Sequence, residues 1–198
     1  MRALSTPFSV PRIPTLFAAV FLLVLGSSLA HAAVITYKAS LSGANESPPN
    51  VSPGVGTGQV DVNTTTHQMH VFATFSGLTG NTTASHIHAP TAVAGTGNAG
   101  VATTTPTFAG FPLGVKSGVY DIILDLTLAS SYNPAYVTAN GGTTAGAEAA
   151  LLAALAAGKA YLNIHSSTFG GGEIRGFLVE MTTPAQSTSW GRIKELYR

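Results

Sequence analysis

Three histidines have the spacing of metal ligands. His86 and His88 flank Ile87 in a segment typical of a β-strand, so both imidazoles project from one face while Ile87 projects from the other. Their Cα atoms are expected about 6.5–7 Å apart, a separation from which two imidazoles can reach one ion. His165 closes a second such segment, 161–165, and also follows an apolar residue. If the two strands are neighbours, these residues form a three-histidine cluster.

The chemistry of such a cluster is that of a transition metal. Neutral imidazoles suit zinc, copper, iron and nickel, whereas calcium and magnesium prefer oxygen ligands. Three histidines with one open coordination position fit a catalytic zinc or a copper ion. The competing interpretation is that the histidines only decorate exposed strands. His67 and His70 lie at and after an expected hairpin turn, and we interpret them as ordinary solvated residues.

Three charged residues could support the cluster: Glu46, Glu173 and Arg175. Glu173 and Arg175 alternate with Ile174, so we expect them on one face of a strand. In one interpretation they orient a metal-bound histidine from outside its coordination shell. The favoured alternative is a structural ion pair between Glu46 and Arg175 that ties the N-terminal loop to the last strand.

Strands must position these residues. Several segments alternate apolar and polar residues between turns rich in Gly, Thr and Asn, which predicts β-strands. Because Ile87, Leu162 and Ile164 must enter the core, we expect the three histidines on one outer face, on strands that are adjacent or one strand apart. The expected strands are 34–41, 57–62, 68–76, 82–88, 119–128, 161–165 and 173–181.

Two further segments complete the expected domain. The segment 89–118 is rich in Gly, Ala, Thr and Pro and is expected to be a long surface connection with one short strand inside it. The segment 144–157 is rich in Ala and Leu and predicts a helix, with Thr143 or Thr144 as N-cap and Glu148 in the first turn. Seven or eight strands with one crossover helix predict a mainly β, antiparallel, Greek-key-like sandwich or barrel.

Composition excludes several classes of protein. The chain has 198 residues, of which 9% are charged and none is cysteine. The lack of cysteine excludes a disulfide scaffold, a thiolate zinc site and a cysteine nucleophile. No block of basic residues favours a nucleic-acid partner, so we expect none.

Residues 1–32 are predicted to be a signal peptide. Arg2 and Arg12 precede the apolar run 16–25, and an A-x-A cleavage site follows at 30–32. We therefore expect export to the periplasm, the cell surface or the extracellular space, with an uncleaved membrane anchor as the alternative. Cleavage leaves seven basic residues against eight acidic ones, which gives no electrostatic reason to bind nucleic acid or an anionic membrane.

The expected β-domain spans 33–181, and the segment 182–198 differs from it in composition. Its first half is a polar linker, and Trp190, Ile193 and Tyr197 in the second half have amphipathic helical spacing. Nine residues are too few for a stable isolated helix. We expect either a frayed terminus or an address or anchoring tag.

Several short motifs occur in order along the chain. They are ANESPP at 44–49, FSGLTG at 75–80, ASHIHAP at 84–90, YLNIHS at 161–166 and GGEIRG at 171–176. Together they cover about residues 35–181 and resemble the CHRD (chordin-type) domain family. That family is named for repeats in chordin, an extracellular binder of growth factors, and also occurs as single exported bacterial domains.

The resemblance implies a β-sandwich with distant similarity to copper/zinc superoxide dismutase. In that comparison His86, His88 and His165 are the positions that would carry over as copper ligands. Two departures are visible: 89–118 contains no histidine or aspartate for a zinc loop, and no cysteine could form the dismutase disulfide. We expect copper binding to survive these losses, and fast dismutation not to.

Three hypotheses follow. The leading one is an exported CHRD-domain module that binds one transition-metal ion, copper in preference to zinc, without turnover. The second is a copper or zinc metalloenzyme, similar to superoxide dismutase, that uses the same histidines. The third is a metal-free surface or adhesion module that contacts an envelope or extracellular protein through the sandwich face or the C-terminal tail.

Overall fold

The computed structural model describes residues 34–181. The predicted signal peptide and the C-terminal segment 182–198 lie outside the described residues. Within 34–181, no helix has the length and apolar character needed to cross a membrane.

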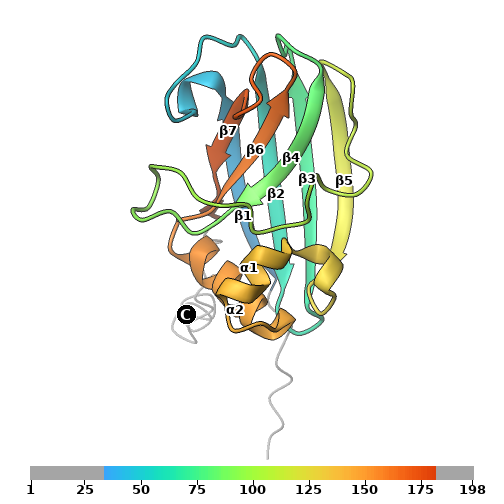
Figure 1. Cartoon of the computed structure of the whole chain (residues 1–198), viewed down its shortest axis with the longest axis vertical. Helices are drawn as coiled ribbons and strands as arrows, with labels where there is room; N and C mark the ends of the chain where they lie inside the picture. The colour runs from blue at the N-terminus through green and yellow to red at the C-terminus, as the bar shows by residue number, and fades with distance from the viewer. Residues whose placement is uncertain (1–33, 182–198) are drawn as a thin grey trace, which may run out of the picture. The chain divides into compact units, whose positions relative to one another are not determined.

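Eight antiparallel strands form one curled sheet, a half-barrel (Figure 1). Their order is β4-β6-β7-β1-β2-β3-β5, and β8 pairs with β1 beside this path. The predicted mainly β, antiparallel architecture of seven to eight strands is therefore confirmed. The strands are β1 Val34–Ser42, β2 Val55–Asn63, β3 Gln68–Ser76, β4 Thr82–His88, β5 Gly118–Asp125, β6 Tyr161–Ser166, β7 Ile174–Phe177 and β8 Val179–Glu180.

Alternation along each strand places one face in a shared hydrophobic core. Val60 of β2 and Val71 of β3 are fully buried and lie opposite each other across the ladder. Ile87 of β4 and Leu162 of β6 form an equivalent buried pair. Burial of each such side chain contributes about 1.5–3 kcal/mol. A slip of one residue would turn these side chains out of the core, so burial fixes the register.

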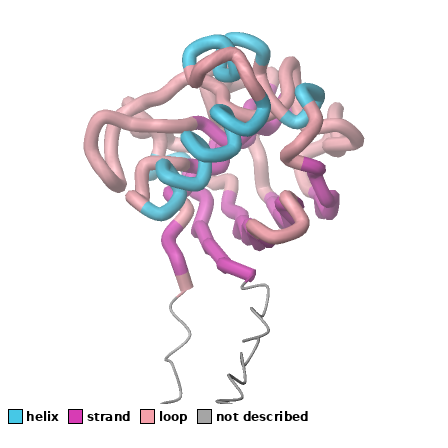
Figure 2. The backbone as a smooth tube through the Cα atoms, turned by 90° about the horizontal axis from the view of Figure 1, so that it is seen from below, coloured by secondary structure: helices cyan, strands magenta, loops and turns pink. Residues whose placement is uncertain are grey.

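Two α-helices lie together near one end of the sheet (Figure 1), and in the end-on view of Figure 2 they gather on one side of the strands. The predicted helix is confirmed, and the Thr143 side chain caps it by accepting a hydrogen bond from the Gly146 amide. Glu148 lies in the second turn instead of the first. The helices are α1 Pro134–Ala139 and α2 Thr144–Ala156, with short 3-10 turns η1 Gly43–Asn45 and η2 Ala129–Ser131.

Helix α1 was not expected, although the sequence carries a signal for it. The Asn133 side chain accepts a hydrogen bond from the Ala135 amide, and Pro134 occupies the first turn. Asparagine at the N-cap followed by proline is a strong helix start.

Two expected strands are also shorter than predicted. β5 ends at Asp125, whose carboxylate accepts from the Thr127 amide at 2.8 Å and so turns the chain.

The expected last strand, 173–181, is interrupted. Leu178 separates β7 from β8: it is fully buried, and its amide donates to the carbonyl of Ala160 at 3.0 Å instead of continuing the ladder. The connection between β4 and β5 also differs from the expected surface loop. It contains only single β-bridges, with no strand, and it buries Ala102 and Phe108 completely.

Candidate metal centre

His86 and His88 of β4 and His165 of the adjacent β6 form one cluster. The two strands pair antiparallel, with Ala84 opposite His165 and Asn163 opposite His86. One ring nitrogen from each histidine lies within 4.8 Å of those of the other two, and the ring centroids are 5.2 to 5.9 Å apart. The predicted three-histidine cluster is therefore present, on the sheet face opposite the hydrophobic core.

The cluster is covered by the chain. His86 and His88 are only 6% and 8% exposed, and His165 is partly buried. The connection between β4 and β5 folds back across this face and brings the carbonyls of Ala99 and Pro106 to the histidine rings. The alternative interpretation, histidines decorating an exposed strand, is therefore wrong. Alternation separates the two faces of a sheet, but it does not reveal that a loop covers the second one.

Each imidazole is oriented by one backbone carbonyl. His86 donates through Nε2 to Pro106 O at 2.6 Å, His88 through Nδ1 to Ala99 O at 2.9 Å, and His165 through Nδ1 to Gly170 O at 3.0 Å. A carbonyl oxygen only accepts, so the bonded ring nitrogen carries the proton. The other nitrogens, His86 Nδ1, His88 Nε2 and His165 Nε2, are buried and have no hydrogen-bond partner within the described residues. Three lone pairs are thus left free on one small site.

Burial keeps the three rings neutral. Desolvation lowers the pKa of His88 to about 4, although its bond to Ala99 opposes the shift. Desolvation also lowers the pKa of His86 and of His165. A neutral imidazole is the form that binds a metal, so the site is ready for an ion at neutral pH without first losing protons.

A second buried polar group lies beside the cluster on β6 and β7. Arg175 pairs with Asn163 across the ladder and lies 3.8 Å from the Glu46 carboxylate. Its Nε donates to Asn45 O at 2.6 Å, which joins β7 to the loop after β1. Burial raises the pKa of Glu46 to about 7, against the lowering effects of Arg175 and Asn163. Glu46 and Arg175 are therefore close enough to act as the ion pair considered above.

Comparison with known proteins places this arrangement in a family. The model of the CHRD domain matches residues 37–178, most of the described chain. The chain belongs to the CHRD domain family. Searches of curated proteins and of solved structures gave no match.

The carboxylate of Glu173 in this CHRD domain makes none of its hydrogen bonds with the three histidines. Instead it accepts hydrogen bonds from Ser52 Oγ at 2.6 Å, from the Thr79 amide and from the Gly80 amide at 3.2 Å. Burial raises its pKa, but the hydrogen bond with the Ser166 side chain and these three together outweigh burial, and the pKa is lowered. Glu173 lies one residue before β7, which begins at Ile174, and its amide donates to Ile164 O of β6 at 2.8 Å. Its contacts join the loops around 52 and 79.

Gly172 explains part of the GGEIRG motif in the CHRD domain. Its φ is +134°, a backbone conformation that favours glycine. A Cβ at this position would come within 2.8 Å of Glu46 Oε1 and of both side-chain atoms Nδ2 and Oδ1 of Asn163. The glycine therefore lets the chain pass directly against the buried Glu46–Asn163 group.

His67 and His70 of the CHRD domain do not join the cluster, nor are they simply solvated. His67 Nδ1 lies 2.9 Å from both carboxylate oxygens of Glu148 on α2. His70 lies between Asp121, at 2.7 Å, and Asp61, at 3.4 Å. His67 is an exposed residue of the β2–β3 turn, as expected. The carboxylate partners were not expected, because they come from segments that only the topology brings close to the two rings.

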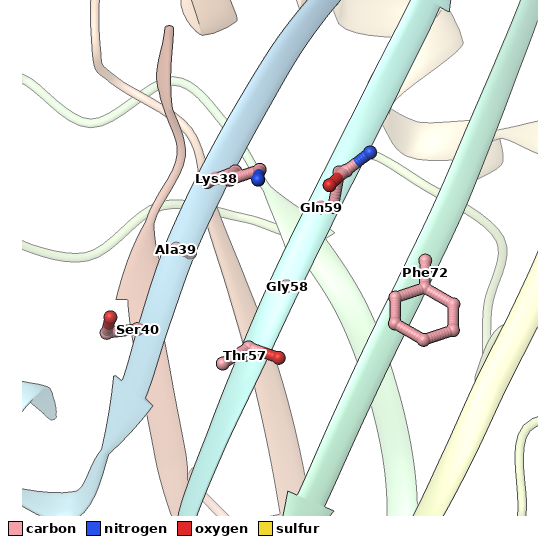
Figure 3. Close-up of a pocket in the computed structure, with 7 residues that line it drawn as sticks. All are labelled: Lys38, Ala39, Ser40, Thr57, Gly58, Gln59 and Phe72. Carbon is pink, nitrogen blue, oxygen red and sulfur yellow. The ribbon is translucent and has the colours of Figure 1, made fainter. Parts of the chain in front are cut away.

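A shallow depression also crosses β1, β2 and β3 on the outer face of the sheet (Figure 3). Lys38, Gln59 and Phe72 project there from three neighbouring strands, over the small residues Ala39 and Gly58. Its lining contains no histidine and no carboxylate. It therefore offers no metal site of the kind formed by β4 and β6.

Two residues of the cluster's surroundings escaped sequence reasoning. Asn163 and Tyr161 alternate with His165 along β6 and so share its face. The Tyr161 ring stacks against His88, with centroids 4.8 Å apart and an interplanar angle of 4°. The same alternation that placed His165 could have identified both residues.

Proposed function

We propose that this CHRD domain is a metal-binding module that holds one transition-metal ion through His86, His88 and His165. Two observations carry the proposal together: each histidine has one buried ring nitrogen without a hydrogen-bond partner among the described residues, and one ring nitrogen of each lies within 4.8 Å of those of the other two. Buried polar atoms are nearly always satisfied, and a metal ion would satisfy all three at once. Metal-bound histidines typically donate their second ring N–H to a carbonyl or carboxylate, as all three do here.

The three imidazole nitrogens suit a small metal ion that is intermediate between hard and soft. Metal–nitrogen bonds of about 2.0–2.1 Å place the ligand nitrogens about 3.3–3.6 Å apart, so small ring movements suffice from the observed spacing. Three neutral nitrogens without thiolate or carboxylate suit copper and zinc, and divalent copper binds such donors more tightly than zinc does. We therefore propose copper, with zinc as the weaker competitor.

Titration of divalent copper into the purified, metal-free protein, against a competing chelator, tests this proposal. We expect one tight equivalent in the wild type and none in the double variant His86→Ala/His165→Ala. The matched control is His67→Ala/His70→Ala, which removes the same number of imidazoles outside the cluster and should keep the equivalent. Full binding in the cluster variant would overturn the proposal, and a metal-free adhesion role would then lead.

We propose binding without turnover, because none of the hydrogen bonds of the three histidines involves an acid that could move a proton. A superoxide assay separates this proposal from a dismutase-like enzyme. The copper-loaded protein should remove superoxide no faster than an equal amount of free copper. A faster rate that disappears in His86→Ala/His165→Ala would favour the enzyme.

We further propose that the module works after export, in the periplasm, at the cell surface or outside the cell. The signal-peptide pattern of residues 1–32 supports this. N-terminal sequencing of the protein recovered from separated cell fractions tests it. The expected first residue is Ala33 in an exported fraction, and an intact N-terminus in the cytoplasm would contradict it.

A further inference from the structure

Loop 93–100 connects the histidine cluster to Arg175. The carbonyl of Ala99 accepts the hydrogen bond from His88 Nδ1 at 2.9 Å. The preceding residue, Asn98, is held on two sides: its Oδ1 accepts from Arg175 Nη1 at 2.7 Å, and its Nδ2 donates to Ser47 O at 3.0 Å. The group that orients His88 is therefore one residue away from the group that Arg175 binds.

A second contact path also joins Arg175 to His88. The guanidinium carbon lies 4.7 Å from the centre of the Tyr161 ring, and that ring stacks in parallel on His88. The Tyr161 hydroxyl oxygen lies 3.3 Å from the Ala99 amide nitrogen and 3.4 Å from its carbonyl oxygen. Both paths begin at one guanidinium and end at one imidazole.

These contacts act on a loop that has few other ties, among them the bonds from the Gly95 amide to Gly158 O at 3.0 Å and from the Ala89 amide to Gly100 O at 3.1 Å. Most of its residues are exposed, and Gly95 and Gly97 adopt positive φ with open space around them. A segment with so little packing of its own moves readily unless it is tied down. Arg175 is a firm anchor, because it is only 3% exposed and is also bonded to Asn45 O.

We propose that Arg175 is a positioning residue of the metal centre and that it acts on His88 through Asn98 and Tyr161. This inference rests on the proposed metal-binding function and adds to it the residues that fix one ligand. The other two ligands serve as an internal reference, since His86 and His165 are oriented by Pro106 and Gly170. In the alternative, Arg175 only ties β7 to the loop after β1, and its loss would lower stability without changing His88.

Copper affinity of single variants provides the first test. Asn98 is exposed, so Asn98→Ala removes the connection without opening the core. Loss of a group that orients a metal ligand typically weakens metal affinity about 10- to 100-fold, and we expect about tenfold here. Asn98→Asp keeps the oxygen that accepts from Arg175 and should restore affinity to within about twofold of the wild type, well below the loss expected for a missing orienting group. Thr96→Ala, in the same loop but outside the contact path, is the matched control and should bind normally.

Side-chain ¹⁵N NMR of the metal-free full chain provides a second test that needs no metal. In the wild type His88 should be protonated at Nδ1 only. In Asn98→Ala and in Tyr161→Phe that single form should give way to a mixture, while the signals of His86 and His165 stay unchanged. Arg175→Lys should show a smaller change in the same direction.

The outcomes separate the two proposals. An unchanged His88 signal in Asn98→Ala, or an equal change in all three histidines, would overturn the positioning role. A wild type that binds no copper, yet shows the selective His88 response, would overturn the metal proposal and leave the positioning role standing. Copper binding that is insensitive to Asn98→Ala, with an unchanged His88 signal, would overturn the positioning role and leave the metal proposal standing.

Discussion

The five histidines of the described chain, residues 34–181, form two groups with opposite surroundings. His86, His88 and His165 are bonded to backbone carbonyls and lie under a covering loop. His67 and His70 are bonded to carboxylates and are more exposed, with side-chain exposures of 49% and 35%. The same residue type therefore occurs once as a neutral lone-pair donor and once as a partner for negative charge.

The difference teaches that the hydrogen-bond partner and burial decide what a histidine can do. A carbonyl selects which nitrogen carries the proton, while burial disfavours the charged ring, so the pKa of the cluster residues falls. The hydrogen bond from His70 to Asp121 favours the charged ring and raises the pKa of His70, against the effect of burial. The spacing of the histidines along the chain distinguishes the two groups only in part, because it does not show which carbonyl or carboxylate each ring will meet in the fold.

The largest expected effect is on acid stability of the metal-free protein. The pKa of His88 falls from 6.5 to about 4 on folding, so the unfolded state binds the extra proton first. With respect to His88, the free energy of unfolding is therefore highest above about pH 6.5 and decreases by roughly 3 kcal/mol as the pH falls toward 4. Glu46 acts in the opposite direction, since its pKa is raised to about 7. The measurement is therefore the difference in unfolding free energy between wild type and His88→Gln, by urea unfolding at pH 7 and pH 4.5. A difference independent of pH would contradict the buried, neutral state of His88.

Copper should stabilise the fold through the cluster alone. A ligand that binds only the folded state adds about 2.7 kcal/mol when its free concentration is 100 times Kd. We expect that gain in urea unfolding of the wild type and of His67→Ala/His70→Ala. It should disappear in His86→Ala/His165→Ala. Equal gains in both double variants would show that the two groups of histidines do not differ as metal ligands.

Glu148→Ala should destabilise the domain by about 1 kcal/mol, the usual net contribution of one intramolecular hydrogen bond. Glu148 is 8% exposed and holds His67, which has a positive φ of 55° at the β2–β3 turn. Thermal unfolding of Glu148→Ala, with the exposed Glu180→Ala as control, measures the effect. Copper affinity should stay unchanged, and a change in it would show that the two groups of histidines are coupled.

The smallest effect concerns His70. Its raised pKa means that its stabilising contribution is present below about pH 6.5 and is lost as the pH rises through the folded-state value. Asp121 is 64% exposed, so screening by solvent limits the contribution to about 0.5 kcal/mol or less. Unfolding free energies of wild type and His70→Gln at pH 6 and pH 8.5 should differ by that amount. A larger difference at pH 8.5 than at pH 6 would contradict the direction of the shift.

The strands and the pairing of the histidines could be predicted because alternation is a local signal. Ile87, Leu162 and Ile164 specify which face enters the core, and the histidines follow from them. The loop that covers the cluster could not be predicted. Every residue has a backbone carbonyl, so the sequence does not mark the ones, such as Ala99 O, that bond to the histidines. The partners of Glu173 could not be predicted for a related reason: they come from the loops around residues 52 and 79, which only the fold brings to the start of β7.

The use of backbone carbonyls to orient the imidazoles has an evolutionary consequence. A carbonyl oxygen is present whatever the side chain, so substitutions at 99, 106 and 170 that keep the path of the main chain leave the acceptors in place. An insertion or deletion of one residue would displace an oxygen that no substitution can restore. Comparison of loop lengths among CHRD domains, more than residue identity, is therefore the criterion for asking which members retain the same three free nitrogens.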